Sequence, residues 1–140
     1  MKKKILFIVL AIILVIAIVA SILIYLNGNY IQIRYVGSSF GPAVVGWTPK
    51  EIILSINRSG NYEYIDNNNS SSIENYTIEH GNIDKEKLNE LEEMIMNIIS
   101  SSAPIDIIVP AISEIYSLKY GSEEYEIPSE TFYDIINAVK

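Results

Sequence analysis

An uninterrupted apolar segment near the N-terminus limits most strongly what this chain can fold into. Residues 5–26, ILFIVLAIILVIAIVASILIYL, carry no charge, and 17 of these 22 residues are Ile, Leu, Val or Phe. At about 1.5 Å per residue such a helix extends about 33 Å, which matches a hydrocarbon core of about 30 Å. The segment has no polar face to turn towards water, as a helix of a soluble core would have. It therefore predicts a transmembrane helix.

A cleaved secretory signal is the alternative interpretation of this segment. Signal peptides have a shorter apolar stretch, of about 7–15 residues, and small residues precede their cleavage site. Cleavage after Ala20 would place Ile18 three residues before the cut, where a small side chain is preferred. We therefore expect an uncleaved anchor.

The charges on either side of the segment predict its orientation. Three lysines, residues 2–4, precede it directly, and the first cation after it is Arg34. Positively charged flanks stay in the cytoplasm, which places residues 1–4 inside and residues 27–140 outside the cytoplasmic membrane. The external part holds seven Lys and Arg against 17 Asp and Glu, a net charge of −10. We expect an acidic domain that nucleic acid would repel, with the lipid bilayer and an unidentified protein as partners.

Alternating apolar residues predict the strands of the external domain. Ile31, Ile33 and Tyr35 alternate with polar neighbours, and turn residues separate similar runs further along the chain. The predicted strands cover residues 31–35, 51–57, 61–65, 75–80, 112–120 and 124–127.

Helical spacing of apolar residues predicts two amphipathic helices. Asp84 is a suitable N-cap for the first helix, and Ser129 is one for the second. The apolar stripes consist of Leu88, Leu91, Ile95, Ile98 and Ile99, and of Phe132, Ile135, Ile136 and Val139. Each half of the domain therefore resembles a glycine-turned hairpin followed by a helix. We predict a small α+β domain, an antiparallel sheet with two helices on one face.

Two segments have neither the strand periodicity nor the helix periodicity, so we predict that they form loops. Residues 37–49 are rich in Gly and Pro and contain the single tryptophan, Trp47, which we expect to cover the core. Residues 67–72, NNNSSS, are polar and turn-prone, and we expect them to loop out.

No group of residues predicts an enzyme. Gly37–Gly41 matches the G-x-S-x-G pattern with Ser39 as nucleophile, and His80 and Asp84 would supply its base and its orienting carboxylate. The prolines and glycine that follow exclude the helix that such a nucleophile requires. The chain is also too short for the sheet of an α/β-hydrolase.

Metal and cofactor chemistry has equally little support in the sequence. The chain has one histidine and no cysteine, which excludes disulfides and Cys-ligated metals. The carboxylates of residues 86–93 and 123–126 lack calcium-loop spacing and fall on predicted exposed faces. We expect no metal site and no cofactor.

Three sets of residues are candidates for modification or contact. Four N-x-[ST] sequons within 19 residues are candidate glycosylation sites, with the composition of an Asn- and Ser-rich loop as the alternative explanation. Strand tyrosines could form a binding surface or stiffen the core. Small residues in the apolar segment could form a helix–helix contact. The three sets are Asn57, Asn68, Asn69 and Asn75; Tyr62, Tyr64, Tyr116, Tyr120 and Tyr125; and Ala11, Ala17, Ala20 and Ser21.

The order of elements resembles the emfourin-like family of small inhibitors of thermolysin-type metallopeptidases, and related small domains of unknown function. The stretches that carry the resemblance are residues 35–41, 88–91 and 116–139, with Ser38-Ser39 where the family has two glycines. The resemblance implies a peptidase-inhibiting module. It does not transfer an inhibitory residue to this chain.

A second likeness is architectural. An N-terminal apolar helix joined to a β-rich, glycosylated external domain is similar to archaeal type IV pilin-like subunits, although Lys4 stands where pilin processing requires a small residue. We therefore expect a membrane-anchored, non-enzymatic binding or accessory domain. The alternative is a structural subunit of a membrane complex or surface filament.

Overall fold

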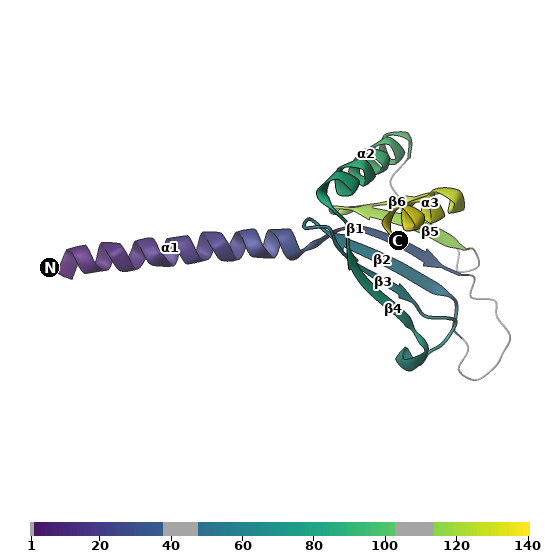
Figure 1. The fold of residues 1–140 in the computed structure, drawn as a ribbon, viewed down its shortest axis with the longest axis horizontal. Helices are drawn as coiled ribbons and strands as arrows, with labels where there is room; N and C mark the ends of the chain where they lie inside the picture. The colour runs from purple at the N-terminus through teal and green to yellow at the C-terminus, as the bar shows by residue number, and fades with distance from the viewer. Residues whose placement is uncertain (1, 38–47, 103–113) are drawn as a thin grey trace.

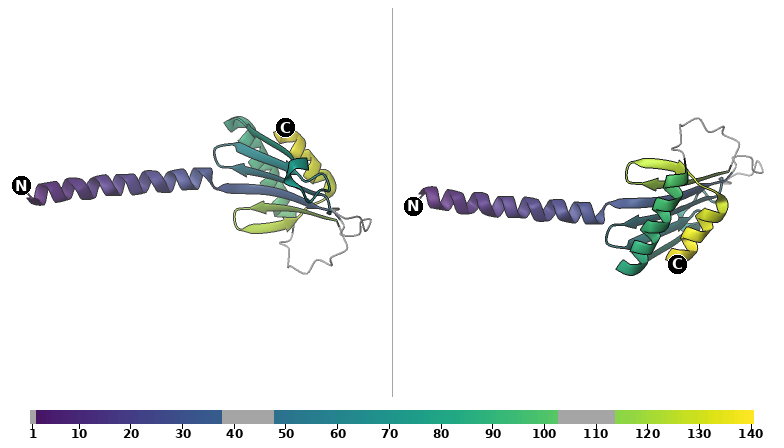
Figure 2. Two further views of the ribbon diagram at one scale, coloured as in Figure 1. Left: turned by 90° about the horizontal axis from the view of Figure 1, so that it is seen from below. Right: turned by 90° about the horizontal axis from the view of Figure 1, so that it is seen from above.

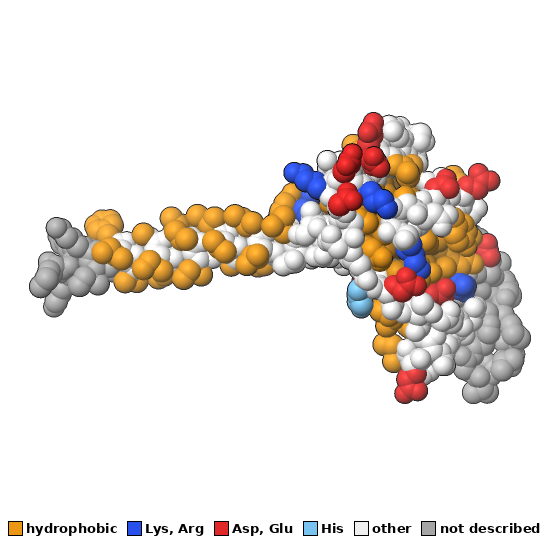
Figure 3. Space-filling model, in the orientation of Figure 1, with side chains coloured by type: hydrophobic (Ala, Val, Ile, Leu, Met, Phe, Trp, Pro, Cys, Tyr) orange, Lys and Arg blue, Asp and Glu red, His pale blue; other side chains and the backbone are white. Residues whose placement is uncertain are grey.

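The chain forms one long helix followed by a small α+β domain. The computed structural model describes residues 2–37, 48–102 and 114–140. Helix α1 (Lys2–Asn27) projects away from the domain, and its segment Phe7–Asn27 is long and apolar enough to cross a membrane (Figure 1). None of that segment is buried inside the protein. Figure 3 shows apolar side chains along the Phe7–Asn27 segment of this helix.

A six-stranded antiparallel sheet forms the centre of the domain. In chain order its strands are β1 (Asn29–Val36), β2 (Glu51–Asn57), β3 (Asn61–Asp66), β4 (Thr77–Asn82), β5 (Ile115–Tyr120) and β6 (Glu123–Glu126). Their order across the sheet is β4-β3-β2-β1-β5-β6. Every neighbouring pair is antiparallel. The predicted antiparallel sheet is therefore confirmed.

Helices α2 (Lys85–Ser101) and α3 (Ser129–Val139) lie against the same side of this sheet (Figure 2). The alternation of each strand points one set of side chains towards them. Ile33 on β1 faces Leu54 on β2 and Leu118 on β5, and all three are fully buried. The helices contribute Leu91, Ile95, Phe132 and Ile135 to the same core. The predicted apolar stripes are thus the surfaces that the helices bury.

The two parts of the domain are not equivalent. β5, β6 and α3 form a hairpin followed by a helix, whereas α2 follows a meander of four strands. The description as two hairpin–helix halves is not confirmed, because β1 and β4 extend the first hairpin on both sides. β1 joins the two parts, since it pairs with both β2 and β5.

The two helices begin differently. The Asp84 side chain accepts a 2.9 Å hydrogen bond from the Lys87 backbone N–H, so Asp84 is the N-cap predicted for α2. The N-cap of α3 is Pro128, and Ser129 is the first helical residue rather than the cap. Proline can occupy this position because its fixed φ suits the extended backbone that precedes a helix.

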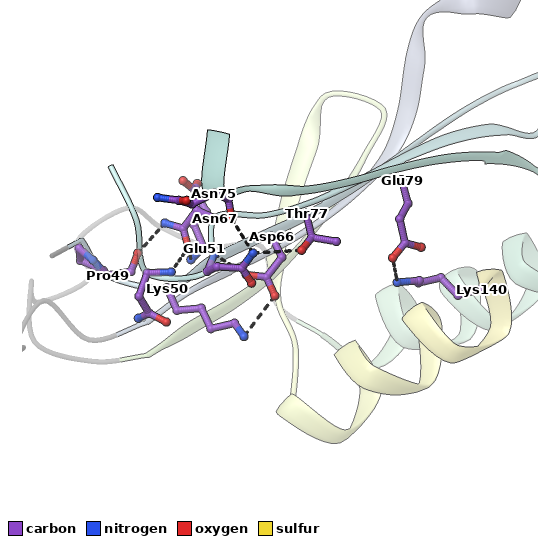
Figure 4. A network of polar contacts seen from close by, with 11 residues as sticks. Pro49, Lys50, Glu51, Asp66, Asn67, Asn75, Thr77, Glu79 and Lys140 are labelled. Atoms are coloured by element: carbon purple, nitrogen blue, oxygen red, sulfur yellow. Dashed lines mark hydrogen bonds and ion pairs between the residues drawn. The ribbon is translucent and has the colours of Figure 1, made fainter. Parts of the chain in front are cut away.

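The connection between β3 and β4 is more ordered than its polar sequence predicts. The buried Asn67 side chain accepts a 2.8 Å bond from the Glu51 N–H and donates a 2.8 Å bond to the Pro49 carbonyl (Figure 4). Asn68 bonds to the Asn75 carbonyl and the Thr77 hydroxyl, across a short 3₁₀ turn, Ile73–Asn75. Asparagine side chains replace strand pairing here, so the segment does not simply loop out.

Candidate functional site

The five tyrosines predicted as a possible binding surface lie on the covered side of the sheet. Tyr64 and Tyr125 are buried, and the other three are half-buried against the core. Tyr116 stacks on Tyr35 at 4.7 Å between ring centres, and Phe132 of α3 meets the Tyr116 ring at 5.3 Å. Tyr116 therefore packs the sheet against α3, as the alternative explanation predicts, and a binding role for the five tyrosines remains a prediction.

Burial also changes the acidity of these phenols. It raises the pKa of Tyr35 to about 12, and the nearby Glu114 carboxylate contributes to the rise. Burial likewise raises the pKa of Tyr30, whose hydroxyl donates a 2.6 Å hydrogen bond to the Glu92 carboxylate. A phenolate in either position would be poorly solvated and close to a negative charge. Both groups are neutral hydrogen-bond donors at physiological pH.

The opposite side of the sheet carries a row of isoleucines. Ile65 on β3 pairs directly with Ile53 on β2 and with Ile78 on β4. Ile53 and Ile65 are half-buried, and Ile78, on the edge strand, is 44% exposed. No helix of the described residues covers this side, which faces the viewer in the left view of Figure 2. We call these three residues the isoleucine row.

Polar pairs flank the isoleucine row on the same side of the sheet. Arg34 forms a 2.6 Å ion pair with Glu51, and Gln32 donates a 3.0 Å hydrogen bond to Ser55. An apolar centre with polar pairs around it is the usual composition of a protein interface.

The junction between α1 and the sheet is a second candidate site. One residue, Gly28, separates the helix from β1, and its N–H donates a 3.0 Å bond to the Ile24 carbonyl. The guanidinium carbon of Arg58, in the β2–β3 turn, lies 4.3 Å from the ring centre of Tyr25 on α1 and 4.5 Å from that of Tyr30. Ser59 donates a 3.4 Å hydrogen bond to the Leu26 carbonyl. The turn is therefore attached to the last turn of α1.

The four sequons occupy two kinds of environment. Asn57 is buried, with 8% of its surface exposed, and its Oδ1 accepts bonds from the Ser59 and Asn61 N–H groups at 2.9 and 3.0 Å. The other three are exposed in the β3–β4 connection, where the side chains of Asn68 and Asn75 donate hydrogen bonds. A glycan could be accommodated in that connection but not on the buried amide of Asn57.

The small residues of α1 are exposed, and three of them share one side of the helix. Ala17, Ala20 and Ser21 are spaced i, i+3 and i+4, while Ala11 lies six residues earlier. Ser21 donates a 2.8 Å hydrogen bond to the Ala17 carbonyl, which satisfies its hydroxyl within the helix. The helix–helix contact remains a prediction.

The structure does not bring together the residues of the G-x-S-x-G pattern. Ser39, like Trp47, lies outside the described residues. His80 is exposed on β4, 3.7 Å from Glu63 on the neighbouring strand, while Asp84 caps α2. Within the described ranges there is no group of three or more acidic or histidine side chains that could hold a metal ion.

Comparison of the chain with protein-family models and with curated proteins finds no match. The isoleucine row and Arg58 must therefore be interpreted from their geometry. The isoleucine row has a signal in the sequence, because Ile53, Ile65 and Ile78 fall between the core positions of their strands. Arg58 has none, because its ring partners come from two distant elements.

Proposed function

We propose that the protein is a membrane-anchored, non-enzymatic binding or accessory domain that presents the isoleucine row to a protein partner. The N-terminus would lie in the cytoplasm and the acidic domain on the outer face of the cytoplasmic membrane. The observation that carries this proposal is the combination of an apolar helix with none of its residues buried and a sheet whose second face no helix of the described residues covers.

The membrane part of the proposal rests on the free-energy cost of exposing α1 to water. A helix as apolar as Phe7–Asn27, with none of its residues buried in the protein, needs an apolar environment. Tyr25, near its C-terminal end, suits the membrane–water interface, where tyrosines are enriched. The lysines of residues 2–4 favour the inward orientation of the N-terminus.

The binding part rests on the contrast between the two faces of the sheet. One face is covered by α2 and α3, and the other presents the isoleucine row beside paired polar groups. The row ends at β4, which is an edge strand. An extended segment of a partner could pair with this edge and place side chains against the row.

The resemblance to emfourin-like domains suggests one form of the partner, a thermolysin-type metallopeptidase. A direct inhibition assay with the full chain in detergent tests this version. Loss of peptidase activity at stoichiometric protein supports it, and unchanged activity restricts the proposal to other partners.

A structural subunit is the second candidate, and the small-residue side of α1 favours it. Pull-down of the full chain, with variants of each surface, separates the two functions. Ile65→Glu introduces a charge into the isoleucine row, and Ala17→Leu fills the small-residue side of α1. We expect a partner that is lost with Ile65→Glu and kept with Ala17→Leu. The reverse pattern would contradict the binding-domain proposal and favour the structural subunit.

A further inference from the structure

The contact between Arg58 and Tyr25 fixes the height of Arg58 relative to a membrane. Tyr25 belongs to the apolar segment Phe7–Asn27, which has about the length of the hydrocarbon core. It lies two residues before the end of that segment, so its ring falls at the membrane–water interface. A guanidinium 4.3 Å from this ring is at the depth of the lipid headgroups. This step rests on the membrane anchoring proposed above.

The Arg58 guanidinium also has N–H donors available to bind an anion. The guanidinium carbon lies 4.3 and 4.5 Å from the ring centres of Tyr25 and Tyr30, and a guanidinium placed over aromatic rings can still donate hydrogen bonds from its edge. Arg58 forms no ion pair with the carboxylates of the described residues, whereas Arg34, Lys50 and Lys140 each do. An arginine edge recognises a phosphate through two parallel hydrogen bonds.

Arg58 lines a groove at the end of the domain that adjoins α1. The groove has a volume of about 350 Å³ and lies between the β2–β3 turn and the start of α2. Lys85, in the first turn of α2, contributes a second cation, and Leu88 contributes apolar surface. In Figure 1 the first turn of α2 is the end of that helix that lies nearer to α1. The groove therefore lies next to the membrane surface.

Two carboxylates also line the groove, and both have protein partners. Glu92 accepts the hydrogen bond of the Tyr30 hydroxyl, and Asp84 accepts that of the Lys87 N–H. Each of these bonds uses one oxygen of its carboxylate. Arg58 and Lys85 form no ion pair with a carboxylate of the described residues, so both cations are available to an external anion even though the domain as a whole is acidic.

We propose that this groove binds the phosphate of a phospholipid headgroup from the membrane that α1 spans, with Arg58 as the bidentate ligand and Lys85 as the second cation. The bound headgroup would hold the base of the domain against the membrane surface. The isoleucine row would then face parallel to the membrane plane, at a fixed height above the bilayer.

The test uses the full chain in nanodiscs made of equal parts of phosphatidylglycerol and a galactosyl diacylglycerol, which has no phosphate. Lipids that stay bound after release into the gas phase are counted by native mass spectrometry. We expect the natural chain to retain phosphatidylglycerol in preference, and Arg58→Gln to lower this retention about tenfold. Arg58→Lys should retain an intermediate amount of phosphatidylglycerol, because lysine keeps the positive charge but lacks the two parallel N–H donors of arginine.

Arg34→Gln is the matched control. It removes a cation from the side of the sheet that carries the isoleucine row, outside the groove, and should leave the retention of phosphatidylglycerol unchanged. If Arg58→Gln disturbs folding, as judged by near-ultraviolet circular dichroism, Lys85→Gln decides, with an expected loss of about threefold. Excess inorganic phosphate should not displace the lipid. Displacement by free phosphate would overturn the lipid assignment.

Failure of this inference is distinguishable from failure of the proposed function. A chain that enters nanodiscs and resists alkaline extraction is membrane-anchored whatever lipid it retains. Equal retention by the natural chain and Arg58→Gln would then overturn the headgroup site alone. A chain that is not recovered in nanodiscs would overturn both.

Discussion

The Tyr30 hydroxyl, on the strand that follows the apolar helix, donates a 2.6 Å hydrogen bond to the Glu92 carboxylate of α2. The same tyrosine ring carries the Arg58 guanidinium, which also lies over Tyr25. One chain of contacts therefore connects α1, the β2–β3 turn and α2. We expect these side-chain contacts to orient the domain relative to the helix.

Loss of the Tyr25 ring should loosen this connection. Tyr25→Leu keeps the helix apolar but removes the surface on which Arg58 stacks. Spin labels are attached to the full chain at Ser21→Cys and Ser122→Cys, and their separation is measured in nanodiscs by pulsed electron–electron double resonance. The distribution of this distance should be broader in Tyr25→Leu. Tyr133→Leu, on the exposed side of α3, is the control and should leave the distribution narrow. Equal widths in all three proteins would show that the stacking does not orient the domain.

Gly60 should tolerate substitution much less well than Gly121. Both have positive φ, +81° and +64°, so a Cβ costs about 1 kcal/mol or more at either position. A Cβ at Gly60 would also collide with the Ile83 carbonyl oxygen, whereas Gly121 has open space around it. In urea unfolding of the full chain in detergent, Gly121→Ala should lose about 1 kcal/mol and Gly60→Ala at least about 2 kcal/mol more. Similar losses would contradict the close packing at Gly60.

The buried amide of Asn57 should contribute to stability, although its sequence suggests a glycosylation site. Asn57→Ala removes the acceptor for two backbone N–H groups, which should cost about 1–3 kcal/mol. Asn75→Ala, in the exposed connection, should cost less than about 0.5 kcal/mol. The same urea titration compares them, and mass spectrometry of the chain from a glycosylating host should find no glycan on Asn57. A glycan there would require an exposed side chain.

High pH should unfold the domain through its buried phenols. Burial raises the pKa of Tyr35 to about 12, from about 10 in an unfolded chain. Between these values the folded state binds more protons than the unfolded state, so the free energy of unfolding falls as the pH rises. Stability should be intact below about pH 10 and lost progressively towards pH 12. Phenolate absorbance at 295 nm and circular dichroism should change together, and Tyr35→Phe should unfold at a higher pH.

Much of the fold is predictable because its strands and helices have clear periodicity. Ile33 and Leu118 lie between polar residues, and Leu91 and Ile95 form a helical stripe, so these elements show their buried side in the sequence. The order of the strands is less predictable, because β1 pairs with β5 across more than 75 residues. Nothing local in β1 specifies that neighbour.

The candidate sites were harder to predict because they depend on which side of the sheet the helices cover. The alternation of Tyr64 and Tyr125 with polar residues is also what an exposed surface would show, yet both are buried. The Asn67 side chain looks like part of a polar loop, but it holds the backbone of Glu51 and Pro49. A side chain that bonds to a distant backbone leaves no periodic signal.

The most direct test of the proposed anchoring and orientation is chemical labelling of a single cysteine on intact cells. The chain has no natural cysteine, and Ser71 is exposed in the β3–β4 connection, so Ser71→Cys provides one reactive position. We predict that a membrane-impermeant maleimide labels this variant before the cells are opened, and that the labelled chain stays in the membrane pellet at alkaline pH. Labelling only after the cells are opened, or release of the labelled chain from the pellet, would contradict it.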